Sequence, residues 1–188
     1  MKAWRMLIAL SFLLLTGCLV TFPDPLPATQ AAPAALLGKW YSKDAWGDHV
    51  NLQITRTGQH HYRASSRAVE PTDDDTGKKR VSLDRVDFTV SRHGNRWYAS
   101  AAMPQAYGGR YAIAGFELTE EGELVIYNLD VDQIKQALAR KTLQGEVYEA
   151  DKNQGVLVAS PQAQVFAYLD DPANSDVFVE IARYRRAK

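Results

Sequence analysis

Residues 50–69 read VNLQITRTGQHHYRASSRAV and contain two strand patterns separated by a turn. In the first pattern, apolar residues at 50, 52 and 54 alternate with polar residues at 51, 53 and 55, which is typical of a half-buried strand. Thr57-Gly58 then marks a turn. In the second pattern, Tyr62 and Ala64 share one face, and polar residues occupy the other. The segment therefore predicts an antiparallel hairpin.

The same alternation continues on both sides of this hairpin. It predicts further strands at 38–41, 81–90, 97–103, 111–118 and 123–128. The pattern changes parity between Leu83 and Val86, so we expect a bulge or a bend near Asp84 and Arg85. An antiparallel meander of this length, from about 38 to 128, favours a barrel or a strongly curved sheet, because closure removes exposed sheet edges.

After residue 128 the apolar period becomes helical. Residues 131–140 predict a helix, with Asp130 as N-cap and Gln133 completing a capping box. We expect strands at 146–150 and 155–159, a second helix beginning at Ser160-Pro161, and a last strand at 177–184. The predicted fold class is α+β and rich in β-structure: a curved antiparallel sheet or barrel with one or two packed helices.

The triplet Gly38-Lys39-Trp40 at the start of the first strand resembles the Gly-x-Trp motif of lipocalins. That family folds as an up-and-down barrel around a small apolar ligand, so the resemblance implies a lipocalin-like barrel. It also implies that an Arg of the last strand packs over Trp40, a role we assign to Arg183 or Arg185. The chain departs from the family in two ways: it lacks a Thr-Asp-Tyr-like segment, and it has a second predicted helix.

The N-terminus has the layout of a secretory signal. Lys2 and Arg5 precede an apolar run, residues 6–15, which is too short to span a bilayer as a helix. The following Leu15-Thr16-Gly17-Cys18 resembles the lipobox of bacterial lipoproteins. The resemblance implies removal of residues 1–17, acylation of Cys18 with chains such as palmitate, and anchoring in the lipid bilayer. An ordinary signal peptide with a stray cysteine is the alternative.

Localisation and domain boundaries follow from the residues after Cys18. In lipoproteins, Leu rather than Asp at position 19 implies the outer membrane with a periplasm-facing domain; the inner membrane stays open as an alternative. Residues 18–35 contain four prolines and predict the lipidated Cys followed by an extended Pro/Ala-rich tether. The alternative is an arm docked through Phe22 and Leu26. Residues 36–188 then form a single domain.

Composition excludes several classes of protein. The chain has 188 residues, 22 basic and 22 acidic, so its formal net charge is zero and we expect no nucleic-acid partner. One cysteine excludes an internal disulfide framework. The four histidines have no ligand spacing that predicts a metal, and nothing indicates a cofactor. The cationic end, residues 183–188, is either a solvated strand end or a patch attracted to an anionic surface.

Small residues are frequent in two of the predicted strands. Ala99 and Ala101 share a face in one strand, and Ala112 and Ala114 share a face in the next. Their small volume leaves space that is filled either by closely packed helices or by a ligand. If a cavity exists, we expect Trp40, Trp97, Tyr111 and Phe116 to line it.

Three hypotheses for function follow. The first is a non-catalytic module that binds a small apolar or amphipathic ligand inside the sheet. The second is an envelope protein with a packed core that binds another protein or the cell wall through its surface. The third is an enzyme, for which Glu117 and Glu123 on one hairpin are the available carboxylate pair. Motifs of nucleophilic catalysis are absent, and we expect no catalytic activity.

Overall fold

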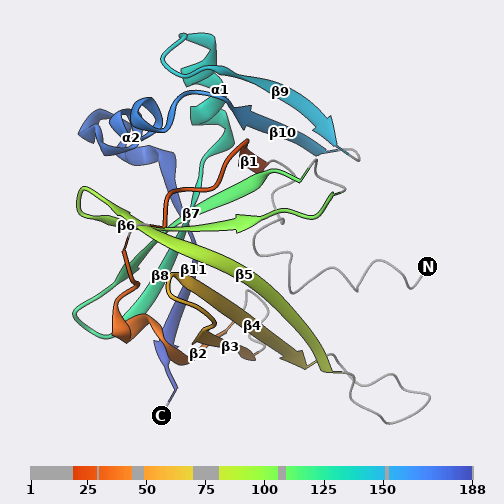
Figure 1. Ribbon diagram of the computed structural model, residues 1–188, viewed down its shortest axis with the longest axis vertical. Coiled ribbons are helices and arrows are strands. Elements are labelled where there is room, and N and C mark those ends of the chain that lie inside the picture. The colour runs from red at the N-terminus through yellow and green to blue at the C-terminus, as the bar shows by residue number, and fades with distance from the viewer. Residues whose placement is uncertain are drawn as a thin grey trace.

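The computed structural model describes residues 19–28, 30–43, 49–69, 81–105, 109–150 and 153–187. Within these residues eleven strands form one sheet, and eight of them close into a barrel (Figure 1). The barrel strands, in chain order, are β2 (Gly38–Lys43), β3 (His49–Arg56), β4 (His61–Val69), β5 (Val81–His93), β6 (Arg96–Ala102), β7 (Tyr111–Leu118), β8 (Glu123–Leu129) and β11 (Phe178–Arg186). The predicted class and the lipocalin-like barrel are confirmed.

The barrel is an up-and-down meander in which each strand pairs antiparallel with the next. β11 closes it by pairing with β8 on one side and with β2 on the other. The β4–β5 register runs unbroken from Val69↔Val81 to His61↔Thr89, so the bulge expected near Asp84 is not present. The register shift lies in β11 instead, between Glu180 and Ala182.

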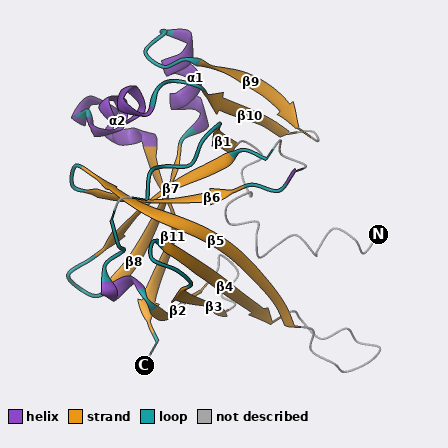
Figure 2. Cartoon of the chain, viewed as in Figure 1, coloured by secondary structure: helices purple, strands orange, loops and turns teal. Residues whose placement is uncertain are grey.

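Between β8 and β11 the chain inserts a layer of helices and a hairpin at one end of the barrel (Figure 2). This insertion comprises α1 (Val131–Ala139), β9 (Gly145–Ala150), β10 (Asn153–Val158), α2 (Gln162–Asp170) and a 3₁₀ segment (Pro172–Val177). His93, the last residue of β5, contacts the Asp170 carboxylate and stacks on Phe166 with ring centroids 4.0 Å apart. These contacts fasten α2 to the barrel.

The predicted helix caps are partly confirmed. Asp130 caps α1, since its carboxylate accepts a hydrogen bond from the backbone N–H of Gln133 at 3.0 Å. Gln133 does not complete a capping box, because its side chain donates to Asp176 instead. The sequence predicts that the second helix begins at Ser160-Pro161, where Ser is a favourable N-cap residue. Ser160 does not cap α2, because its hydroxyl accepts a hydrogen bond from the N–H of Gln144.

Two hydrophobic cores stabilise the fold. The barrel core lies inside the barrel and is built from Leu36, Trp40, Leu52, Ile54, Tyr62, Val90, Phe116, Leu124 and Tyr184. The outer core lies between the barrel wall and the insertion, and includes Tyr98 and Ile113 from β6 and β7 with Ile134, Val156, Val165 and Phe166 from the insertion. Strands β6 and β7 therefore contribute one face to each core, as alternation requires.

The N-terminal segment belongs to the fold, so the predicted free tether is wrong. Residues Leu19–Phe22 form strand β1, which pairs parallel with β10 and antiparallel with β7. Val20, Phe22 and Leu26 are buried in the outer core. The prolines do not prevent this, because they follow the strand and β1 needs only four residues. The docked-arm alternative, with Phe22 and Leu26 as anchors, describes the structure.

Because β1 is part of the outer core, Val20→Ala is expected to lower the free energy of unfolding by about 2 kcal/mol. Val20 is 5% exposed, so the lost methyl groups leave a cavity. Val147→Ala is the matched control, since Val147 on β9 is 50% exposed and should change stability by less than about 0.5 kcal/mol. Urea denaturation measures the free energy of unfolding of both variants. Equal stability of the two would mean that β1 does not contribute to the core, as the tether prediction requires.

Candidate functional site

One end of the barrel is closed around Trp40. A 3₁₀ turn, Ala34–Leu36, precedes β2, and the Trp40 indole N–H donates to the Leu36 carbonyl at 3.0 Å. The Arg186 guanidinium lies 4.3 Å from the indole ring centroid and donates to the carbonyls of Leu37 and Ala35. The resemblance predicts an Arg over this Trp, and the residue is Arg186, not Arg183 or Arg185.

Glycine at position 38 is required by this arrangement. Its φ of +123° disfavours any side chain, and a Cβ there would lie 2.6 Å from the Arg186 guanidinium. Gly38, Trp40 and Arg186 therefore act as one structural unit that seals the barrel. Trp40 is 1% exposed, which makes it part of the seal and not part of a ligand surface.

The inward face of β6 and β7 is lined by alanine. Ala99 lies opposite Ala114, and Ala101 lies opposite Ala112, in the antiparallel register. All four are half-buried. They share their face with Phe116, as alternation along β7 shows, and so point into the barrel. Four facing alanines therefore put little side-chain volume on the part of the inward face beyond the packed core at the sealed end.

The helices of the insertion do not pack on this alanine face. The opposite face of the same two strands, with Tyr98 and Ile113, is the one that contacts the insertion. Burial there raises the pKa of the Tyr98 hydroxyl to about 12. The alanines face away from the insertion. The helices therefore pack on the outer face of β6 and β7, and not on the alanines as one alternative predicts.

The four predicted lining residues do not form one surface. Trp40 and Phe116 are buried in the barrel core. Trp97 is half-buried against that core and stacks on Phe116 with ring centroids 6.1 Å apart. Tyr111 pairs with Phe22 of β1 and alternates with Ala112, so it points to the outer side of the barrel.

The barrel wall opens between β2 and β11. In the described residues these strands pair at Arg185↔Tyr41 and Arg186↔Trp40, and the ladder stops before Ser42. There the Ser42 hydroxyl donates to the Arg183 carbonyl at 2.7 Å in place of a backbone bond. A groove of about 780 Å³ follows, lined by Tyr41, Ser42, Lys43, Val50, Glu180, Ile181, Ala182, Arg183, Tyr184 and Arg185. We call it the β2–β11 groove.

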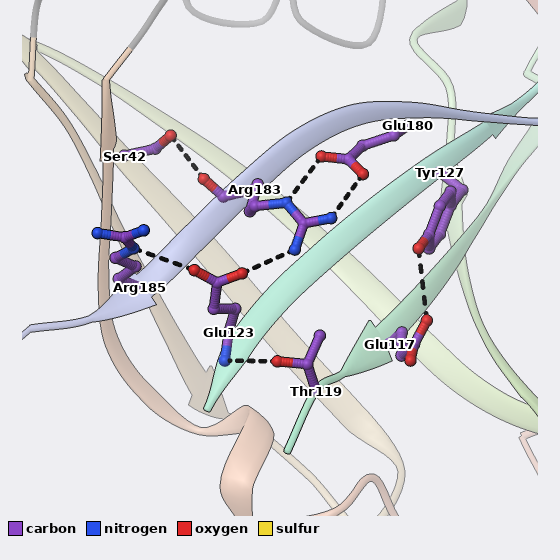
Figure 3. A network of polar contacts seen from close by, with 8 residues as sticks. All are labelled: Ser42, Glu117, Thr119, Glu123, Tyr127, Glu180, Arg183 and Arg185. Atoms are coloured by element: carbon purple, nitrogen blue, oxygen red, sulfur yellow. Dashed lines mark hydrogen bonds and ion pairs between the residues drawn. The ribbon is translucent and has the colours of Figure 1, made fainter. Parts of the chain in front are cut away.

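An ion-pair network lies along the outer side of β11 (Figure 3). Arg183 donates to Glu180 at 2.8 and 3.0 Å and to Glu123 at 2.7 Å, and Arg185 donates to Glu123 at 3.0 Å. Hydrogen bonds from Arg183 and Arg185 hold the pKa of the Glu123 carboxyl below its usual value. Most of the cationic C-terminal strand is thus paired within the fold.

The carboxylate pair considered for catalysis is not assembled. Glu123 binds two guanidinium groups, whereas Glu117 accepts a hydrogen bond from Tyr127 at 3.4 Å (Figure 3). A carboxylate held ionised by two arginines is a poor proton donor near neutral pH.

In the described residues, no three His, Cys, Asp or Glu side chains are grouped so that they could hold a metal ion. None of the helices in those residues is long and apolar enough to cross a bilayer. Cys18 lies outside the described residues.

Comparison of the chain with protein-family models, with curated proteins and with solved structures finds no match.

Proposed function

We propose that this protein is a lipid-anchored, periplasm-facing and non-catalytic module that binds a small apolar or amphipathic ligand inside its barrel. The observation that carries the proposal is the inward alanine surface of β6 and β7, where Ala99↔Ala114 and Ala101↔Ala112 remain half-buried. A concave, largely apolar surface above a sealed end is the usual form of a small-molecule site.

The sealed end supports this proposal because the residues that stabilise the barrel there are different from the residues proposed to bind the ligand. Trp40, Leu36 and Arg186 close one end with a dense set of contacts. The alanines lie farther along the same barrel. Larger side chains at these positions would have extended the packed core. On this proposal the sealed end is the stable base, and the interior beyond it is left for the ligand.

Titration with a dansyl-labelled undecanoic acid tests the ligand proposal. We expect a saturable rise in dansyl emission with one site per chain. Emission that rises linearly with protein concentration, without saturation, would contradict a barrel site.

The anchor is proposed from the lipobox, with Cys18 acylated in the outer membrane. Leu19 begins β1 and directly follows Cys18, so no spacer separates an acyl chain there from the folded unit. Cells grown with labelled palmitate should incorporate label into the chain and lose it in Cys18→Ala. Separation of inner and outer membranes on a density gradient then assigns the membrane; label that persists in Cys18→Ala would refute the anchor.

A second candidate is an interaction module, and the edge of the sheet favours it. Among the described strands β9 is the last in the sheet order, and its Val147 is 50% exposed. An unpaired edge with an apolar side chain accepts a strand from a partner. Val147→Lys should abolish cross-linking to an envelope partner under this hypothesis and leave fatty-acid binding unchanged.

A further inference from the structure

The β2–β11 groove shares residues with the inward face of the barrel. Alternation and pairing place Ser42, Val50, Ala182 and Tyr184 on the inward side of their strands. Tyr184 belongs to the barrel core, and Val50 and Ala182 pack against it. The floor of the groove is therefore also part of the inner wall of the barrel.

The rim of the groove is polar and carries a surplus of positive charge. Lys43, Arg183 and Arg185 are the lining cations, and Glu180 is the lining carboxylate. Arg183 and Arg185 are already paired, with Glu180 and with Glu123. Lys43 is exposed and makes no ion pair in the described part of the chain. It is the rim charge available to a ligand.

An apolar floor lies beneath Lys43, a cation without an ion pair among the described residues. This combination matches a molecule that has an apolar part and an anionic part. An alkyl chain is stabilised where it leaves water, whereas an anionic head group is stabilised at the surface beside a positive charge. The groove volume of about 780 Å³ lies in the range of small-molecule sites. Because the wall is open here, the two parts of one ligand are able to occupy the interior and the rim together.

We propose that the β2–β11 groove is a side entrance for a single-chain amphiphile with an anionic head group, a carboxylate or a phosphate monoester. The alkyl chain enters the barrel between β2 and β11, over Ala182 and Val50, and the head group remains at Lys43. This inference rests on the proposed function, since it assumes an apolar ligand in the barrel. It adds the chemical class of that ligand and its route.

Calorimetric titration with decanoate, decyl phosphate and 1-decanol tests the inference. The chain from Leu19 onward is used, because it contains both cores and every described strand. In Lys43→Gln we expect the affinity for the anions to fall about fivefold, as for an exposed charge pair, and the affinity for 1-decanol to stay unchanged. The tighter of the two anions identifies the head group.

Lys39→Gln is the matched control for the head group. Lys39 is exposed, and it lies on the same strand and the same outward face as Lys43, but toward the sealed end. Its loss should leave all three affinities within about twofold of the original, because a charge about 13 Å away is screened. Ala182→Phe fills the floor of the groove and should weaken all three ligands.

The outcomes separate this inference from the proposed function. If no amphiphile binds the unaltered chain, the proposed function itself fails. If 1-decanol and decanoate bind, but Lys43→Gln and Lys39→Gln behave alike, the head-group site is wrong. If they bind and Ala182→Phe has no effect, the groove is not the entrance and the ligand enters elsewhere.

Discussion

Trp40→Ala is expected to lower the free energy of unfolding by about 3–5 kcal/mol, a large part of the stability of a domain this size. The indole is 1% exposed at the centre of the seal. Its removal leaves a cavity, deprives the Leu36 carbonyl of its donor and removes the surface on which Arg186 stacks. Thermal and urea denaturation followed by circular dichroism measure the loss.

Two further variants test whether the loss of stability in Trp40→Ala comes from the contacts of Trp40 at the sealed end. Tyr41→Ala removes the neighbouring aromatic side chain, which is 36% exposed, and should cost less than about 1 kcal/mol. Trp40→Phe keeps a buried ring but loses the N–H donor, and should fall between the other two. Equal destabilisation by Trp40→Ala and Tyr41→Ala would show that the barrel end is not organised around Trp40.

Ala101→Phe is expected to weaken binding of the dansyl-labelled fatty acid by about tenfold or more, because the added ring occupies the space proposed for the alkyl chain. Ala101 is half-buried and faces Ala112 across the β6–β7 ladder. If the barrel interior has free volume, the variant should fold with nearly unchanged stability. Fluorescence titration and thermal denaturation are measured on the same sample.

Ala102→Phe is the matched control for this experiment. Ala102 is the next residue of the same strand, but it points to the opposite face and is exposed. It should alter neither binding nor stability. A packed interior gives a different result: Ala101→Phe would then be destabilised by about 1–3 kcal/mol from overpacking, and neither variant would change binding.

Local patterns in the sequence predict most of the barrel. Period-two alternation places strands β2 to β8 close to their observed bounds, and the change to a helical period locates α1 and its Asp130 cap. These signals depend on neighbouring residues, and antiparallel meanders join strands that are neighbours in the chain. The two α-helices and the last strand follow from the same kind of evidence.

The N-terminal strand shows where such patterns fail. β1 pairs parallel with β10, whose residues lie more than 130 positions later in the chain. Nothing within four residues specifies a partner at that distance, whereas the prolines that follow favour an extended spacer. Docking of this segment through Phe22 and Leu26 could be proposed as an alternative, but the local sequence could not select it.

The candidate site was predicted only in part, because some of its features depend on strand pairing that the local sequence does not specify. The facing alanines of β6 and β7 are visible in the sequence, and the register confirms that they oppose one another. The choice of Arg186 over Arg183 and Arg185 depends on the register shift in β11, which is set by pairing with β8. The β2–β11 groove arises where a ladder stops, and neither strand alone signals that end.

The most direct test of ligand binding in the barrel is native mass spectrometry of the chain from Leu19 onward, before and after incubation with excess decanoate. A barrel site predicts a single adduct that saturates at one per chain, is lost on denaturation, and is absent in Ala101→Phe but present in Ala102→Phe. The mass of the bare chain under every condition, from a sample shown to be folded, would contradict the account.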